Sequence, residues 1–190
     1  MAYDVEFAAM CEQESSQPLT LSDGTVVRFR PIRPDDEPMM VAFHRSLSSD
    51  SVYSRYFNVF KLARRTTHAR LCGVCHPDPL HDTVLVAEVF YDERKPEIAG
   101  VGRVSGNQEM SSGEVALIVS DAFQRRGLGK ELLRRLILAA REKGLTRIRA
   151  HVLRGNLAMQ RLCASAGMCI SERSAPGAGA NPDVTMCMKL

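Results

Sequence analysis

The sequence contains no uninterrupted apolar run of about 18 residues, the length that a membrane-spanning helix needs. It also carries little excess charge, because 25 Lys and Arg residues stand against 22 Asp and Glu residues, for a formal net charge of +3. An excess this small does not indicate nucleic-acid binding, which needs a clustered basic face. We therefore expect neither a membrane nor a nucleic acid as a partner.

Basic residues are missing from the start of the chain. No Lys or Arg precedes Arg28, so the positively charged beginning of a secretory signal is absent. Without export, we expect the six scattered cysteines to be reduced thiols, several of them half-buried in apolar runs. Together these features predict a cytoplasmic protein.

The length and composition predict one globular domain. The chain has 190 residues, of which 45% are hydrophobic and 25% charged. Residues 1–18 are acidic and end in Ser-Ser-Gln-Pro, so we expect an N-terminal extension there. That extension is either a frayed arm or an arm that docks on the domain or on a second subunit. The domain itself is expected over residues 19–190.

Strands and helices alternate along the expected domain. The clearest element is a helix whose apolar stripe repeats every fourth residue from Leu128 to Ala140 and which ends at Gly144. We expect a shorter helix over 156–166 and two or three short helices between 36 and 75. The strands are expected at 25–32, 83–90, 98–105, 114–120, 146–152 and 184–190. Short connections between 83 and 120 predict an antiparallel meander inside a mixed α/β sheet with covering helices.

One turn combines glycines with cations where a strand meets the long helix. Residues 124–130 read Gln-Arg-Arg-Gly-Leu-Gly-Lys. Backbone N–H groups at a helix start are unpaired and carry partial positive charge, and glycines allow a ligand close to the backbone. The turn therefore predicts a pyrophosphate cradle. It is neither a Walker loop nor a dinucleotide fingerprint, because its glycines are spaced differently.

The pattern formed by Gln124, Gly127 and Gly129 resembles the phosphate motif of the GNAT superfamily of N-acetyltransferases. A second segment is similar to the family's downstream motif, which begins here at Asn156 and ends with Gly167-Met168. Residues 21–36 and 47–57 resemble the opening of Pat-type bacterial protein-lysine acetyltransferase domains. The resemblance covers about residues 20–190. It implies the GNAT fold, an α/β structure whose mixed, mostly antiparallel sheet of about six to seven strands is flanked by helices.

The resemblance also implies an activity, the transfer of an acetyl group from acetyl-CoA to a primary amine. The acceptor would be a protein lysine or a small molecule. We expect no metal at the site, and whether two copies of the chain form a homodimer stays open. Eleven positions are then expected to bind the coenzyme. They are Leu117, Ile118 and Val119 on the strand, Gln124, Arg125, Arg126, Gly127, Leu128, Gly129 and Lys130 in the turn, and Asn156 downstream.

Two residues are candidates for the catalytic base. A lysine amine has a pKa of about 10.4 and must lose a proton before it reacts. By resemblance, Glu114 matches a catalytic Glu of related protein acetyltransferases, and His151 matches a strand position where other members keep a glutamate base. Glu114 lies five residues before Val119, on the order of 16 Å along a strand, which is comparable to a pantetheine arm. Histidine titrates near neutral pH and could do the same work, so the choice stays open.

Cys163 departs from the family pattern. It stands where many members have the Tyr that protonates the leaving thiolate. A thiol has a pKa of about 8.5, so its thiolate can leave without an acid. Cys163 is therefore either the proton donor or a small buried apolar residue.

Two other classes of function remain. One is a non-catalytic acyl-CoA sensor that keeps the cradle but has lost the base. The other is a zinc or redox module at residues 72–81, where Cys72, Cys75 and His76 form a Cys-x-x-Cys-His string. Nearby cations at Lys61, Arg64-Arg65 and Arg70 are expected to form a solvated face, which could also steer an acidic protein substrate.

Overall fold

The computed structural model describes residues 17–58, 60–91, 95–107, 111–173 and 183–190. They form one sheet with the strand order β1-β2-β3-β4-β5-β6-β8-β7. All neighbouring strands are antiparallel except β5 and β6, which are parallel. The strands are β1 (Leu19–Thr20), β2 (Val26–Pro31), β3 (Asp82–Val89), β4 (Glu97–Asn107), β5 (Ser112–Val119), β6 (Arg147–Leu153), β7 (Cys169–Arg173) and β8 (Asp183–Lys189).

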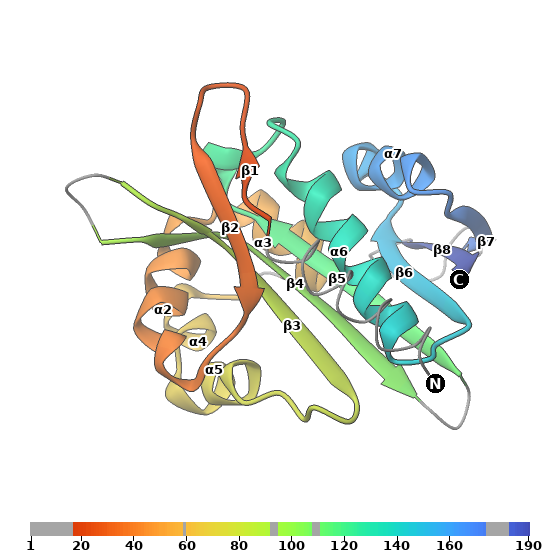
Figure 1. Cartoon of the computed structure of the whole chain (residues 1–190), viewed down its shortest axis with the longest axis horizontal. Helices are drawn as coiled ribbons and strands as arrows, with labels where there is room; N and C mark the ends of the chain where they lie inside the picture. Colours follow the sequence, from red (N-terminus) through yellow and green to blue (C-terminus); the bar gives the residue numbers. More distant parts are fainter. Residues whose placement is uncertain (1–16, 59, 92–94, 108–110, 174–182) are drawn as a thin grey trace.

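Helices cover both faces of the sheet (Figure 1). They are η1 (Pro34–Asp36), α2 (Glu37–Ser46), α3 (Ser49–Tyr56), α4 (Leu62–Arg65), α5 (His68–Cys75), η2 (Asp121–Phe123), α6 (Leu128–Glu142) and α7 (Leu157–Ser165). On one face the apolar stripe of α6, including Leu132 and Leu136, is completely buried against the strands. On the other face Phe43 of α2 and Leu71 of α5 belong to a second buried cluster.

The sheet parts between its two parallel strands. β5 and β6 are paired only where residues 112–114 face residues 147–149. Beyond Glu114, β5 stays paired with β4 as far as Val119 but has no ladder partner on the side of β6. This opening leads directly to η2 and the start of α6.

The sequence-based expectations for the fold are largely confirmed. The mixed α/β class, the meander β3-β4-β5 and the helices at 128–142 and 157–165 are present. The sheet has eight strands rather than six to seven, because β1 and β7 are short edge strands without a clear apolar pattern. Four α-helices, rather than two or three, lie between 37 and 75.

Two expected segments lie mostly or wholly outside the described residues. They are the extension at 1–18, of which only Gln17 and Pro18 are described, and the loop at 174–182. Within the described part of the chain, no helix is both long enough and apolar enough to cross a bilayer. A cytoplasmic location stays a prediction.

Tight packing between α6 and β4 gives a prediction about stability. A Cβ atom at Gly102 would lie 2.7 Å from Leu136 Cδ1 and 3.1 Å from Leu132 Cγ, and both leucines are completely buried. We expect Gly102→Ala to lower the free energy of unfolding by about 1–3 kcal/mol through overpacking. In α5, a Cβ at Gly73 meets nothing within 4 Å, so Gly73→Ala should raise stability by up to about 1 kcal/mol through helix propensity. Denaturant unfolding of both variants checks the pair, and equal midpoints would contradict the packing described here.

Candidate functional site

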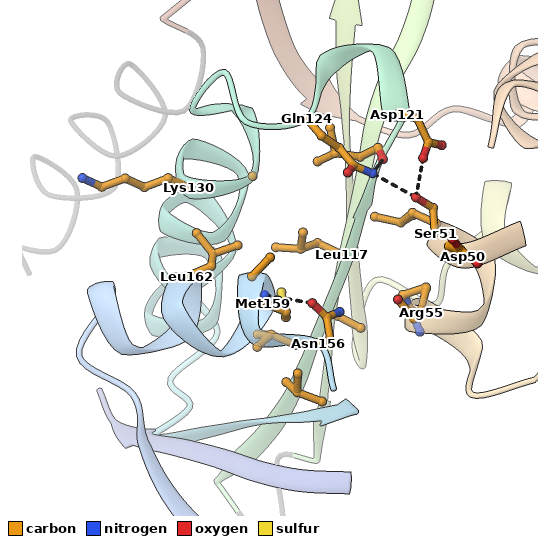
Figure 2. A pocket seen from close by; sticks show the side chains of 18 of the residues that line it. Asp50, Ser51, Arg55, Leu117, Asp121, Gln124, Lys130, Asn156, Met159 and Leu162 are labelled. Atoms are coloured by element: carbon orange, nitrogen blue, oxygen red, sulfur yellow. Dashed lines mark hydrogen bonds between the residues drawn. The ribbon is translucent and has the colours of Figure 1, made fainter. Parts of the chain in front are cut away.

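A cavity of about 780 Å³ follows β5 from Glu114 to Val119 and reaches the start of α6. It lies where β5 and β6 are not paired, so α7 and α3 supply much of its remaining wall (Figure 2). Leu117 of β5, Met159 and Leu162 of α7 give it an apolar middle. Its two ends are polar and differ in character.

One end is a turn whose backbone amides are unpaired. Arg125 and Gly127 have φ angles of 62° and 90°, in the left-handed region. Within the described residues, the successive N–H groups from Arg125 to Gly129 donate to no partner, and the first intrahelical bond runs from Lys130 N to Gly127 O at 3.0 Å. Free N–H groups at the positive end of a 15-residue helix are well suited to bind a phosphate.

Gly129 is not required by packing. A Cβ at this position would lie 3.5 Å from Leu162 Cδ2 and farther from every other atom, which is ordinary contact. The residue lines the cavity within the first turn of α6, where alanine is also a better helix former. A side chain at position 129 would fill open space beside the free amides.

The cations of the turn do not all reach the cavity. Arg126 forms an ion pair with Asp23, and its guanidinium lies 5.7 Å from the Phe123 ring centroid. Lys130 lines the cavity, but its side chain extends outward from α6, away from Gln124 and Ser51, as Figure 2 shows. Leu128 is completely buried. Every other predicted coenzyme-binding residue lines the cavity, whereas Arg126 and Leu128 do not, so any contact from them would come through their backbone.

A hydrogen-bond network that the sequence did not predict holds the turn against α3. The Asp121 carboxylate accepts bonds from Ser48 N at 2.9 Å, Ser48 Oγ at 2.7 Å and Ser51 Oγ at 2.9 Å. Gln124 Nε2 donates to Ser51 Oγ at 2.9 Å and to the Val119 carbonyl at 3.0 Å (Figure 2). Burial raises the pKa of Asp121, but the bonds from Ser48 and Ser51 outweigh it and hold the pKa below its ordinary value.

The other end of the cavity brings both predicted bases together. Glu114 Oε2 lies 3.9 Å from His151 Nε2, and His151 Nδ1 lies 3.5 Å from Asp183 Oδ2. Glu114 and His151 are on neighbouring parallel strands and both line the cavity. Arg55 of α3 lines it as well and interacts electrostatically with Glu114. A carboxylate and an imidazole in this position can accept a proton from a bound group.

Cys163 is not at the cavity. Its side chain is completely buried on α7, and burial raises the pKa of its thiol to about 11. Of the two roles left open by the sequence, this placement favours the buried apolar residue.

The Cys-x-x-Cys-His string is part of α5 and its end. Cys72 Sγ lies 3.6 Å from His76 Nδ1, while Cys75 is buried in the core beside α2, where burial raises the pKa of its thiol to about 11. Among the described residues, no three His, Cys, Asp or Glu side chains are grouped so that they could hold a metal ion. The described geometry gives no support to a zinc module.

A family model and several relatives match this chain. The model of the acetyltransferase (GNAT) family matches residues 52–168. The chain is 30% identical over 145 residues to acetyltransferase Pat of Mycolicibacterium smegmatis, which is 76% of this chain but 42% of that protein. It is 29% identical over 148 residues to an acetyltransferase of Pseudomonas aeruginosa, covering 78% of this chain and 77% of that protein. The chain therefore spans less than half the length of the Pat relative.

Solved structures share the fold. The GNAT domain of S. lividans PAT is 27% identical and superposes with a TM-score of 0.78, covering 92% of this chain and 96% of that chain. The structure of yncA from Salmonella typhimurium, determined with its cofactor acetyl-CoA, is 22% identical with a TM-score of 0.58, covering 86% of this chain and 93% of that chain. The expected fold class is thereby confirmed.

The network around Asp121 gives a prediction with a defined pH dependence. Asp121→Asn should lower stability at neutral pH by about 1 kcal/mol, because the amide cannot accept all of these bonds and the site is exposed. Since the carboxyl pKa is lowered on folding, the stabilisation is full above the unfolded-state pKa of about 3.9 and is lost as the pH falls further. The difference in Tm between the two proteins should thus be constant from pH 7 to 5 and shrink below about pH 4.

The matched control is Asp50→Asn on α3, the helix whose Ser51 donates to Asp121. The Asp50 side chain lines the cavity, and within the described residues its carboxylate has no hydrogen bond or ion pair. Asp50 is in the first turn of α3, so its variant should lose only the small interaction with the helix dipole and should lower the Tm less than Asp121→Asn does. A Tm difference for Asp121→Asn that persists unchanged at low pH would contradict the role assigned to the carboxylate.

Proposed function

Because this chain belongs to the GNAT family of acetyltransferases, we propose that it transfers an acetyl group from acetyl-CoA to a primary amine. The observation that carries the proposal is the row of free N–H groups at 125–129, placed at one end of a cavity that follows the unpaired edge of β5. A thioester coenzyme needs both features, a phosphate cradle and a long slot for its arm. The catalytic pair stands at the opposite end.

The residues around the cavity would hold the coenzyme in a fixed direction. The amides from Arg125 to Gly129 would bind the pyrophosphate. The edge of β5 from Leu117 to Val119 would offer backbone groups to the pantetheine arm. Asn156 Oδ1 accepts from Met159 N at 3.0 Å, so this residue shapes the cavity wall by capping α7. The acetyl end would then lie toward Glu114.

We assign Glu114 as the base, with His151 positioning it. Glu114 would take the proton of the ammonium form of the acceptor, directly or through one water, which leaves a neutral amine beside the acetyl carbon. The thioester supplies an activated acyl group whose thiolate can depart without a protein acid. His151 lies between Glu114 and Asp183, and its Nδ1 is 3.4 Å from Thr185 Oγ1. In this place it would orient the Glu114 carboxylate.

A protein lysine is our proposed acceptor class. The support is the similarity to Pat of Mycolicibacterium smegmatis and to the GNAT domain of S. lividans PAT, both above one quarter identity. A non-catalytic acyl-CoA sensor is the second candidate. Its support is that Cys163, which stands where the resemblance expects the proton donor, is buried and does not line the cavity. The two differ in turnover, because a sensor would bind acetyl-CoA and acetylate no amine.

Coenzyme binding gives the first prediction of this proposal. We expect wild-type protein to bind acetyl-CoA in calorimetry, and Gly129→Ala to weaken that binding by roughly tenfold or more, because the methyl group occupies space beside the free amides. The unfolding midpoint of this variant should be unchanged or slightly raised. Gly73→Ala, far from the turn, should bind as the wild type does. A folded wild-type protein that shows no binding at millimolar CoA would overturn the proposal.

Turnover gives the second prediction. Glu114→Gln should lower kcat by about 100-fold to 10,000-fold while the Kd for acetyl-CoA stays unchanged, because the amide keeps the shape but accepts no proton. Glu142→Gln, an exposed change at the end of α6, is the control and should leave both values alone. His151→Gln should lower kcat by a smaller factor. If His151→Gln were the more damaging change, the base would be His151.

A further inference from the structure

A second cavity of about 340 Å³ lies on the α2–α5 face of the sheet. Arg55, Ala116 and Ile118 line this cavity and the first one alike. Ala116 and Ile118 follow Glu114 at two-residue steps on β5, so all three share one face of the strand. The second cavity is therefore a side chamber next to the proposed acetyl-transfer position.

The walls of this chamber carry more positive than negative charge. Apolar side chains from α2, α5, β3, β4 and β5 are joined by Arg55, Arg70 and Arg103, and no Asp or Glu lines it. Arg103 is paired with Asp82 at 2.7 Å. Arg55 and Arg70 form no ion pair with any described carboxylate, although Arg55 interacts electrostatically with Glu114. Their guanidinium carbons lie 5.0 Å and 4.9 Å from the ring centroid of Tyr56. Two guanidinium groups thus lie over one ring, and no described carboxylate forms an ion pair with either of them.

Buried polar atoms without partners lie beside the same chamber. His44 lines it, is only 2% exposed, and its Nδ1 has no hydrogen-bond partner within the described residues. Arg65 is 7% exposed, and its Nε and Nη1 are likewise unpartnered. Burial first, and then the charges of Arg65 and Arg70, lower the pKa of His44 to about 4, so its ring is neutral at pH 7. Buried groups of this kind normally have hydrogen-bond partners. A carboxylate in the chamber would accept a hydrogen bond from His44 in the tautomer that carries its proton on Nδ1.

We propose that this chamber binds a carboxylate carried by the acceptor, close to the amine that is acetylated. The inference rests on the proposed function, because it takes Glu114 as the place of the amine. Ala116 lies two residues from Glu114, about 7 Å along the strand, so amine and carboxylate belong to the same or adjacent residues of the acceptor. Arg55 and Arg70 would hold the carboxylate, and the apolar walls would cover the carbon atoms that carry it.

Two sources offer this chemistry, a free amino acid and an Asp or Glu beside an acetylated protein lysine. The first experiment compares both against uncharged partners. One arm measures kcat/KM for peptides in which the lysine is flanked by Glu or by Gln. The other arm measures it for free amino acids and for their carboxamides. We expect a preference for the carboxylate of roughly 10-fold to 100-fold in one arm, and that arm identifies the source. Equal values in both arms would overturn the inference.

Substitution at Arg70 tests which residues produce the preference. Arg70→Gln should abolish the preference for the carboxylate by raising KM for the charged acceptor, with kcat and the Kd for acetyl-CoA nearly unchanged. Arg70→Lys should retain part of it, because the charge remains but the planar fork is lost. Arg64→Gln is the matched control. Arg64 and Arg70 both lie over the Phe60 ring, but Arg64 is exposed and does not line the chamber. A preference that survives Arg70→Gln would contradict the assignment.

Butyrate binding separates this inference from the proposed function. The wild type should bind butyrate at the chamber, detected by shifts of the His44 ring signals in NMR, and Arg70→Gln should bind it at least tenfold more weakly. Butyrate binding that is independent of Arg70 overturns the chamber, even if acetyl transfer is observed. A different result would be a protein that binds acetyl-CoA, and binds butyrate through Arg70, but acetylates no amine. That result would overturn both the proposed acetyltransferase activity and the proposal that the chamber binds a carboxylate of the acceptor.

Discussion

The parting of β5 from β6 after Glu114 is the constraint on which the rest of the site depends. Backbone N–H and C=O groups need partners, and β5 loses those of β6 while it keeps those of β4. β6 in turn is held by β8 on its far side, so the sheet is not broken as a whole. The outcome is a slot along an edge of β5 that β6 does not pair, placed inside a sheet that is otherwise continuous.

The position of α6 follows from the same arrangement. The chain leaves β5 through η2 and enters α6 within a few residues, so the unpaired amides of the helix start lie at the end of the slot. Bonds from Ser48 and Ser51 to Asp121, and the ion pair between Arg126 and Asp23, fix this turn from two separate parts of the N-terminal region. A turn that is held before its ligand arrives loses less conformational entropy on binding.

Local pattern predicted those parts of the structure that depend on local physics. The stripe from Leu128 to Ala140 and the glycine turn before it are found where the sequence placed them. The approach of Glu114 to His151 depends on a parallel register between strands separated by α6, which no local pattern reveals. For the same reason the sequence could not show that Arg126 is paired with Asp23, which lies 103 residues away in the chain.

The cations between 61 and 70 show the limit of reading charge from sequence. They were expected to form a solvated face, and Arg64 is indeed exposed. Arg65, its neighbour on α4, is buried, and Arg70 of α5 lines the second cavity, because neighbouring residues of a helix point in different directions. A run of like charges is divided by helix geometry into groups with different surroundings.

One end of the site consists mainly of backbone groups and the other of side chains, and this difference explains why only the first could be identified from a sequence motif. The coenzyme end is made largely of backbone amides and needs only glycines and a helix start, so a short motif is enough to identify it. The acceptor end is made of side chains from α2, α3, α5, β4 and β5, brought together by the sheet topology alone. Family membership therefore indicates the donor, whereas in our proposal the acceptor is selected by charges such as those of Arg55 and Arg70, which only the folded chain places over the same ring.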